Sequence, residues 1–282
     1  MLILLTDKCN LSCKHCMHAA SPEGSRFMNY DLFSLCISRA KELGARVINI
    51  AGGEPTLLSP EELDKFLSLP LEEGFVVILE TNGFFLYNEK SVEYLSVLTG
   101  LMSKYSNFWI QVSSFSEYYA NHQKVKSVLM DEHNNYVKGL INTAKNRLTV
   151  SDDNTMSIQL IALGRCSEGK MLERAKTFNR FPSCINSALI SKQCDLGLHA
   201  CRVLEDNRRF CVPMIDPDGG MHMGESIFCK TICSINDDIN IIRDSMQNYK
   251  PCGKCANYHW HFDNPQTIKE KHVAELLDLQ NI

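Results

Sequence analysis

The sequence predicts an α/β fold: a parallel sheet with helices on its outside, followed by a small cysteine-rich α+β domain. Over the first ~190 residues, short apolar segments alternate with segments of helical apolar spacing, which is typical of β–α repeats. After about residue 195 this alternation stops and cysteines become dense. We therefore expect a core domain over 1–194 and a C-terminal domain over 195–282.

The core elements follow from apolar patterning and from their start signals. Ser59 can cap a helix that has Pro60 in its first position and acidic residues in its first turn. The expected strands are 2–5, 46–51, 75–80, 108–114, 157–163 and 185–190. The expected helices are 30–44, 59–69, 89–105, 132–146 and 168–178. Six such β–α steps imply a parallel sheet that is either open or curled into a partial barrel.

The C-terminal part has a different pattern. A Pro-Asp-Gly-Gly sequence at 217–220 lies between two apolar segments and predicts a β-hairpin. A helix is expected at 237–247, and the segment 264–279 predicts a final helix. This combination indicates a small α+β unit.

Composition excludes several classes of protein. The chain has 282 residues, of which 44% are hydrophobic and 22% charged, and a formal net charge of -4, which argues against a general nucleic-acid binder. A local basic groove stays open as an alternative. The first ten residues are too short and too soon polar for a signal peptide, and no apolar run has the length of a membrane span. We therefore expect a cytoplasmic protein without membrane contact.

Thirteen cysteines in such a chain indicate metal binding or catalysis, because cytosolic thiols stay reduced. Most of them fall into three groups. Cys36 lies inside an expected helix and is interpreted as a small core residue. The groups are Cys9, Cys13 and Cys16; Cys201, Cys211, Cys229 and Cys233; and Cys252 and Cys255.

The first group follows the first expected strand, in the sequence CNLSCKHC. Parallel α/β proteins bind ligands at the carboxyl ends of their strands, and cysteine thiolates are the usual ligands of iron–sulfur clusters. Three thiolates on a four-iron cluster leave one iron open. The alternative is a zinc site completed by His15 or His18, which the spacing disfavours because structural zinc usually takes paired CxxC ligands.

CNLSCKHC resembles the CxxxCxxC signature of radical S-adenosylmethionine (SAM) enzymes. Three further stretches resemble motifs of these enzymes and follow in the same order: GGEPTL at 52–57, TNG at 81–83 and GRC at 164–166. The resemblance spans most of the first 190 or so residues. It implies a partial (β/α)6 radical SAM barrel, with Cys9, Cys13 and Cys16 as ligands of a [4Fe–4S] cluster.

The resemblance also implies which residues contact SAM. Glycines at 52 and 53 allow close backbone approach, and Glu54 or nearby carbonyls can accept hydrogen bonds from the methionyl amino group. Arg165 can pair with the SAM carboxylate, and Ser113 or Ser114 can bind the ribose hydroxyls. The full expected set is Gly52, Gly53, Glu54, Thr81, Asn82, Ser113 and Arg165.

The later cysteines resemble the twitch domain, the shortened form of the SPASM extension, which binds one auxiliary [4Fe–4S] cluster. The implied ligands are Cys211, Cys229, Cys252 and Cys255. The register leaves open that Cys201 or Cys233 replaces Cys211 or Cys229. A zinc knuckle formed by the same cysteines is the alternative.

The implied function is radical SAM chemistry. SAM is cleaved reductively to a 5′-deoxyadenosyl radical, which abstracts a substrate hydrogen, and the auxiliary cluster helps to complete an oxidation or bond formation. An electron donor such as flavodoxin or ferredoxin is the expected partner. The substrate is a small metabolite or a peptide, and a start directly at the first strand mildly favours a small molecule. The alternatives are a synthase or isomerase resembling the molybdopterin-pathway enzyme, and a non-enzymatic iron–sulfur binding module.

Overall fold

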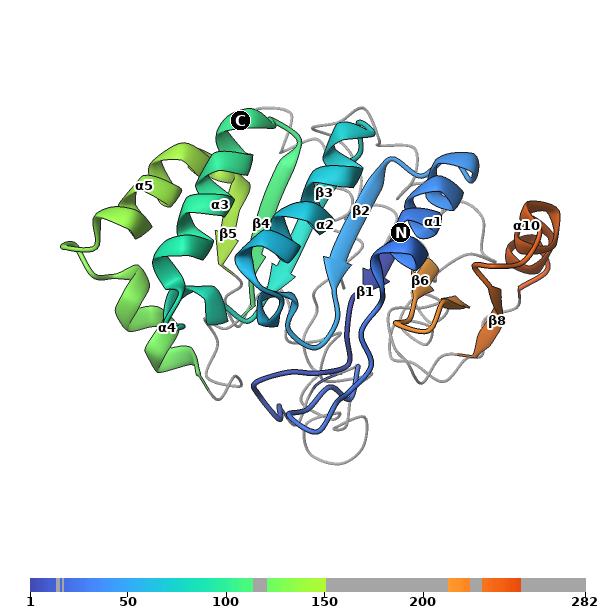
Figure 1. The fold of residues 1–282 in the computed structure, drawn as a ribbon, viewed down its shortest axis with the longest axis horizontal. Helices are drawn as coiled ribbons and strands as arrows, with labels where there is room; N and C mark the ends of the chain where they lie inside the picture. Colours follow the sequence, from blue (N-terminus) through green and yellow to red (C-terminus); the bar gives the residue numbers. More distant parts are fainter. Residues whose placement is uncertain (14–15, 17, 114–120, 151–212, 224–229, 250–282) are drawn as a thin grey trace, which may run out of the picture.

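The computed structural model describes residues 1–13, 16, 18–113, 121–150, 213–223 and 230–249. These residues form a mixed α/β structure around one eight-stranded sheet with the order β5-β4-β3-β2-β1-β6-β7-β8 (Figure 1). Strands β1 to β5 are parallel to their neighbours, β6 runs parallel to β1, and β7 and β8 are antiparallel. The strands are β1 (Leu2–Leu4), β2 (Val47–Ala51), β3 (Val76–Thr81), β4 (Phe108–Val112), β5 (Leu148–Val150), β6 (Pro213–Ile215), β7 (Gly220–Met223) and β8 (Thr231–Ser234).

Helices α1, α2 and α3 lie across one face of the parallel strands (Figure 1). Alternate side chains of β2, β3 and β4 point into the core beneath these helices, where Ile48, Leu79 and Phe108 are fully buried. The described helices are α1 (Tyr30–Glu42), α2 (Pro60–Glu72), α3 (Ser91–Lys104), α4 (His122–Leu129), α5 (Asn135–Ala144) and α10 (Ile239–Gln247), with short 3₁₀ turns η1 (Pro55–Leu57), η2 (Phe84–Leu86) and η3 (Lys145–Arg147). In the described part of the chain, no helix is both long and apolar enough to cross a membrane.

Local start signals act as expected at α2. The Ser59 side chain accepts from the backbone N–H of Glu62, and the Glu62 carboxylate accepts from the backbone N–H of Ser59. This reciprocal capping box, with Pro60 in the first position, confirms the predicted helix start.

Three elements of the described part of the chain differ from the sequence prediction. Helix α4 and strands β5 and β8 were not expected, because each is short. Arg147 explains where β5 begins: its guanidinium donates to the carbonyl oxygens of Met102 (2.8 Å) and Tyr105 (2.6 Å), which anchors the chain beside β4. The expected strands 157–163 and 185–190 and the expected helices 168–178 and 264–279 lie outside the described residues.

The predicted hairpin around 217–220 is confirmed as β6–β7, and α10 lies within the predicted helix 237–247. This hairpin extends the core sheet, since Leu2 and Ile3 of β1 pair with Met214 and Ile215 of β6. The boundary expected at residue 194 and the sixth barrel strand lie outside the described residues, so the partial barrel and the two-domain division stay predictions.

Candidate functional site

Four candidate segments meet at one edge of the sheet, because β1 to β4 are parallel and end there together. Thr6 follows β1, Gly52 follows β2, and Asn82 follows β3. Ser113 follows β4, and its backbone N–H donates to the carbonyl of Thr81 at 2.8 Å. This edge therefore brings the cysteine segment, the GGEP segment and the TNG segment side by side.

The cysteine loop, defined here as residues 9–20, is closed at its base by two arms that hydrogen-bond to each other. The arms are residues 5–9 and 21–28. The backbone N–H of Met28 donates to the carbonyl of Leu5 (2.8 Å), and the N–H of Cys9 donates to the carbonyl of Ser21 (2.9 Å). These bonds hold the two ends of the loop together and fix Cys9 relative to the sheet.

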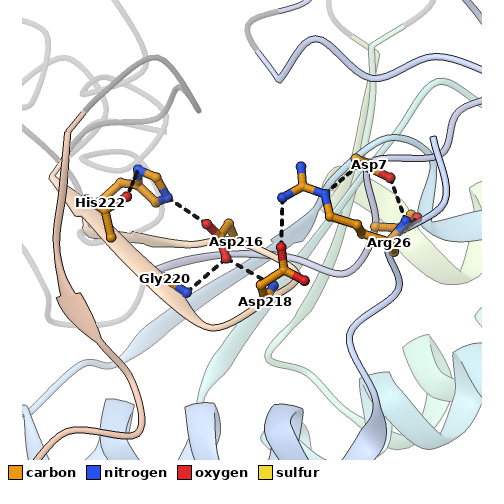
Figure 2. Close-up of polar contacts among 8 residues, drawn as sticks. Asp7, Arg26, Asp216, Asp218, Gly220 and His222 are labelled. Carbon is orange, nitrogen blue, oxygen red and sulfur yellow. Dashed lines mark hydrogen bonds and ion pairs between the residues drawn. The ribbon is translucent and has the colours of Figure 1, made fainter.

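An arginine connects this base to the C-terminal hairpin (Figure 2). The Arg26 Nε lies 2.6 Å from Asp7 Oδ2, and its Nη1 lies 2.9 Å from Asp218 Oδ2 at the hairpin tip. Burial alone would raise the pKa of Asp7, but the hydrogen bonds from Arg26 outweigh it and the pKa is lowered. The ionised Asp7 is therefore the favoured state beside Arg26.

The hairpin itself is organised by one carboxylate (Figure 2). Asp216 Oδ1 accepts from the backbone N–H groups of Asp218 (3.0 Å) and Gly220 (2.8 Å), and Oδ2 lies 2.8 Å from Nε2 of buried His222. Burial opposes the charge of Asp216, yet the His222 contact and the two N–H donors hold its pKa below the usual value. Side-chain contacts thus connect the turn to β7, in addition to the backbone hydrogen bonds between β6 and β7.

The two glycines of the GGEP segment allow it to pack directly on the arm before Cys9. The N–H of Gly53 donates to the carbonyl of Thr6 at 2.6 Å, and the N–H of Glu54 donates to the carbonyl of Lys8 at 2.9 Å. A Cβ on Gly53 would overlap the Lys8 carbonyl, and Gly52 has a φ of +138°. The packing of these two chain segments is therefore enough to explain why both positions are glycine.

Glu54 is fully buried and joins the GGEP segment to the TNG segment. Its Oε1 accepts from the Thr56 N–H (3.0 Å) and from the hydroxyls of Thr56 and Thr81 (2.6 Å each), and its Oε2 accepts from the Asn82 N–H (2.7 Å). Burial raises the pKa of Glu54, and the hydrogen bonds from these donors act in the opposite direction. The contacts give this carboxylate an organising role that the sequence analysis did not assign.

Asn82 continues this connection to the first cysteine. Its Nδ2 lies 3.6 Å from Cys9 Sγ and donates to Asn10 Oδ1 at 2.8 Å. Asn121 Nδ2 donates to the carbonyl of Asn82 (3.0 Å) and to the Tyr87 hydroxyl (2.8 Å). The sequence does not predict the roles of Asn10, Tyr87 and Asn121, because their contacts join segments that share no motif.

The thiols of the cysteine loop differ in exposure. Cys9 is 8% exposed, whereas Cys13 and Cys16 are partly exposed, and none of the three is in a disulfide. Burial raises the pKa of the Cys9 thiol to about 12, and the nearby Glu54 carboxylate adds to this. Since metal coordination deprotonates a thiol outright, a bound metal would overcome this barrier. Cys36 lies buried in α1, as the sequence predicted.

Several candidate residues fall outside the described part of the chain. They are Ser114, Arg165, Cys201, Cys211, Cys229, Cys252 and Cys255, together with His15. Cys233 is described: it lies on β8 with its Sγ 3.7 Å from the Met221 sulfur. Burial lowers the pKa of His18 to about 4, and its Nδ1 has no hydrogen-bond partner among the described residues. Among the residues the structure describes, no three His, Cys, Asp or Glu side chains converge on a single-ion site.

Comparison with protein families gives a match over the first part of the chain. Residues 3–138 match the model of the Radical SAM superfamily. The matched region, somewhat less than half of the chain, is similar to a radical SAM domain. Proteins of this superfamily hold a [4Fe–4S] cluster and SAM. The donor set of the cysteine loop fits such a cluster, because three cysteine thiols outside any disulfide lie on one anchored loop.

Two curated relatives are similar to part of this chain. "Probable GTP 3′,8-cyclase" of Sulfolobus acidocaldarius is 34% identical over 86 residues, which are 30% of this chain and 26% of the relative. The protein of the same description from Pyrococcus horikoshii is 38% identical over 55 residues, 20% of this chain and 18% of the relative. The matches thus span about a quarter or less of either relative's own length.

Two solved structures share the fold. The crystal structure of BtrN in complex with AdoMet and 2-DOIA has a TM-score of 0.50 at 16% identity, over 94% of this chain and 85% of that chain. The structure of native anSMEcpe with bound AdoMet and Cp18Cys peptide has a TM-score of 0.50 at 14% identity, over 99% and 98%. At this identity the likeness concerns the fold alone.

Proposed function

We propose that this protein is a radical SAM enzyme in which Cys9, Cys13 and Cys16 hold a [4Fe–4S] cluster with one iron open to SAM. The observation that carries the proposal is the convergence on Cys9: Glu54 ties the GGEP and TNG segments together, and Asn82 lies within 3.6 Å of the Cys9 sulfur. When bound, the cluster and SAM supply one-electron cleavage to methionine and a 5′-deoxyadenosyl radical that abstracts hydrogen from substrate.

The residues of the chain prepare the site for this chemistry. The backbone of Gly52 and Gly53 is held against the cysteine arm, so its remaining carbonyls form a fixed edge for the amino group of SAM. We assign Glu54 mainly to holding this edge, because its carboxylate already accepts from Thr56, Thr81 and Asn82. Ser113 is assigned to the ribose hydroxyls and Arg165 to the SAM carboxylate.

The reaction class we favour is an oxidation or bond formation assisted by an auxiliary [4Fe–4S] cluster. Its proposed ligands are Cys211, Cys229, Cys252 and Cys255, with Cys201 or Cys233 as replacements for either of the first two. Support comes from the fold shared with BtrN and anSMEcpe, which are described with a small molecule and a peptide respectively. The substrate class is accordingly a small metabolite or a peptide, and a low-potential donor such as flavodoxin or ferredoxin supplies the electron.

A second candidate is a synthase acting on a purine nucleotide. The similarity to two proteins described as GTP 3′,8-cyclases favours it, although this similarity covers only 30% and 20% of this chain. The two candidates differ in a simple assay. A cyclase consumes GTP together with SAM under reducing conditions, whereas an enzyme of the first class leaves GTP unchanged.

The proposed function is tested by reductive SAM cleavage. Anaerobically reconstituted protein is mixed with dithionite and SAM, and 5′-deoxyadenosine is quantified by liquid chromatography. We expect formation by the wild type and none by the variant with Cys9→Ala, Cys13→Ala and Cys16→Ala. Cys36→Ala is the matched control, because Cys36 lies buried in α1 away from the loop. Product from the triple variant at the wild-type rate would refute the proposal.

The auxiliary cluster has its own test. Reconstituted wild type should bind about eight iron atoms, as two four-iron clusters. A Cys252→Ala, Cys255→Ala variant should retain about four and still cleave SAM, because the cysteine loop belongs to the core. An iron content of about four atoms in the wild type, unchanged in this variant, would contradict the proposal of an auxiliary cluster.

A further inference from the structure

We propose that Asn82 is a positioning residue for the cluster: its side-chain amide donates an N–H···S hydrogen bond to the Cys9 thiolate and raises the reduction potential of the cluster. The inference rests on the proposed function, in which Cys9 is a cluster ligand. It assigns to the asparagine of the TNG segment a role toward the cluster sulfur. The distance from Asn82 Nδ2 to Cys9 Sγ is 3.6 Å.

The orientation of the Asn82 amide is determined by its neighbours. Its Oδ1 accepts from the backbone N–H of Phe84 at 3.0 Å, and a backbone N–H is always a donor. The NH₂ group therefore faces the other way, where one hydrogen reaches Asn10 Oδ1 (2.8 Å) and the other faces Cys9 Sγ. A flipped amide would set a donor against the Phe84 N–H.

Asn82 is also held in place along its backbone. Its N–H donates to Glu54 Oε2 at 2.7 Å, and its carbonyl accepts from Asn121 Nδ2 at 3.0 Å. The residue is 7% exposed, and Gly83 follows it with a φ of +79°, which allows the tight turn into η2. The donor is therefore preorganised and does not have to be recruited when charge develops on the sulfur.

The expected effect follows from charge. The Cys9 side chain is largely shielded from water. Two N–H groups lie near its sulfur, from Asn82 and from Leu11 (3.4 Å), and they stabilise negative charge there in place of water. Reduction adds one electron from an external low-potential donor to the cluster, with no proton transfer. The reduced form carries one more negative charge, so N–H donors stabilise it more than the oxidised form and raise the potential.

Three variants separate this role from a structural one. Asn82→Ala removes the donor, and Asn82→Asp keeps the shape but places a carboxylate oxygen toward the sulfur. Tyr87→Phe is the control, because its hydroxyl accepts from Asn10 and Asn121 in the same polar group but gives nothing to Cys9. Each protein is reconstituted, its iron content is measured, and the reduced-cluster EPR signal that SAM perturbs is followed in a redox titration.

We expect the Asn82→Ala variant to show a severalfold lower equilibrium constant for reduction, where a tenfold loss corresponds to about 59 mV for one electron. Asn82→Asp should be lower still, and Tyr87→Phe should equal the wild type. An unchanged or higher potential in Asn82→Ala overturns the inference. If the alanine variant does not bind a cluster, an unchanged or higher potential in Asn82→Asp overturns it. Failure of the wild type to bind a cluster would instead contradict the proposed function.

Discussion

Arg26 and Asp218 form an ion pair of 2.9 Å although 192 positions separate them in the sequence. The pair joins the base of the cysteine loop to the tip of the β6–β7 hairpin (Figure 2). Asp7 holds the other side of the same guanidinium at 2.6 Å. The C-terminal hairpin is thus connected to the cysteine loop by side chains as well as through the pairing of β6 with β1.

The two carboxylates beside Arg26 should contribute unequally. The Asp218 side chain is 64% exposed and that of Asp7 is 21% exposed, so solvent screens the contact of Arg26 with Asp218 far more than its contact with Asp7. Asp218→Asn should lower the free energy of unfolding by less than about 1 kcal/mol. Asp7→Ala should cost about 1–3 kcal/mol, because it also leaves the Arg26 N–H without its acceptor. Urea denaturation measures both, and equal losses would show that the hairpin contact is stronger than its exposure implies.

Glu54→Gln is expected to destabilise the protein despite its similar shape. Both carboxylate oxygens accept from backbone N–H groups, so a glutamine must turn its NH₂ toward one of them. One buried donor then lacks an acceptor, at a cost of about 1–3 kcal/mol in unfolding free energy. Glu62→Gln is the control, because glutamine can also serve in the capping box with Ser59. Equal stability of the two variants would contradict the organising role of Glu54.

Gly53→Ala should disrupt the packing of the GGEP segment on the arm before Cys9. The added Cβ would overlap the carbonyl of Lys8, which is backbone and cannot rotate away. We expect a loss of more than about 2 kcal/mol in unfolding free energy, with reduced iron binding after reconstitution. Gly100→Ala is the matched control: it lies inside α3 with open space around it, and should stabilise by about 0.5–1 kcal/mol. Normal stability and iron content in Gly53→Ala would exclude the close packing.

The pair of Asp216 and His222 predicts part of the acid stability. The folded-state pKa of Asp216 lies below the ordinary pKa of an aspartate, so its ionised form stabilises the fold above that ordinary value. This contribution is lost as the pH falls below the ordinary aspartate pKa and through the lower folded-state pKa. An Asp216→Asn variant lacks it, so its unfolding free energy should change less between about pH 5 and pH 3 than that of the wild type. If the unfolding free energies of the two proteins change equally with pH, groups other than Asp216 cause the acid sensitivity.

Much of the core could be predicted because its signals are local. Apolar segments marked β2, β3 and β4, and Ser59 with Pro60 marked the start of α2. The turn at 217–220 marked the β6–β7 hairpin. The glycines at 52 and 53 were also recognised, although the structure adds chain packing to their explanation. In each case the residue that carries the signal is adjacent to the element it specifies.

The contacts around Cys9 could not be predicted in the same way. Asn10 and Asn121 meet Asn82 of the TNG segment because segments that are distant in sequence come together at one edge of the sheet, and neither Asn10 nor Asn121 carries a sequence signal for this contact. The same holds for the placement of β6 beside β1, which depends on long-range pairing. The donors around the Glu54 carboxylate include Thr81 and Asn82, which lie on another strand end, so the sequence of the GGEP segment alone does not reveal them.

The most direct measurement for the central claim is EPR of the reduced, reconstituted protein with and without SAM. The account holds that three thiolates, from Cys9, Cys13 and Cys16, leave one iron of the cluster open to SAM. Addition of SAM should therefore change the g-values of the wild-type signal, and the Cys9→Ala, Cys13→Ala, Cys16→Ala variant should show no SAM-sensitive signal. A wild-type cluster signal that stays identical at saturating SAM would contradict the account.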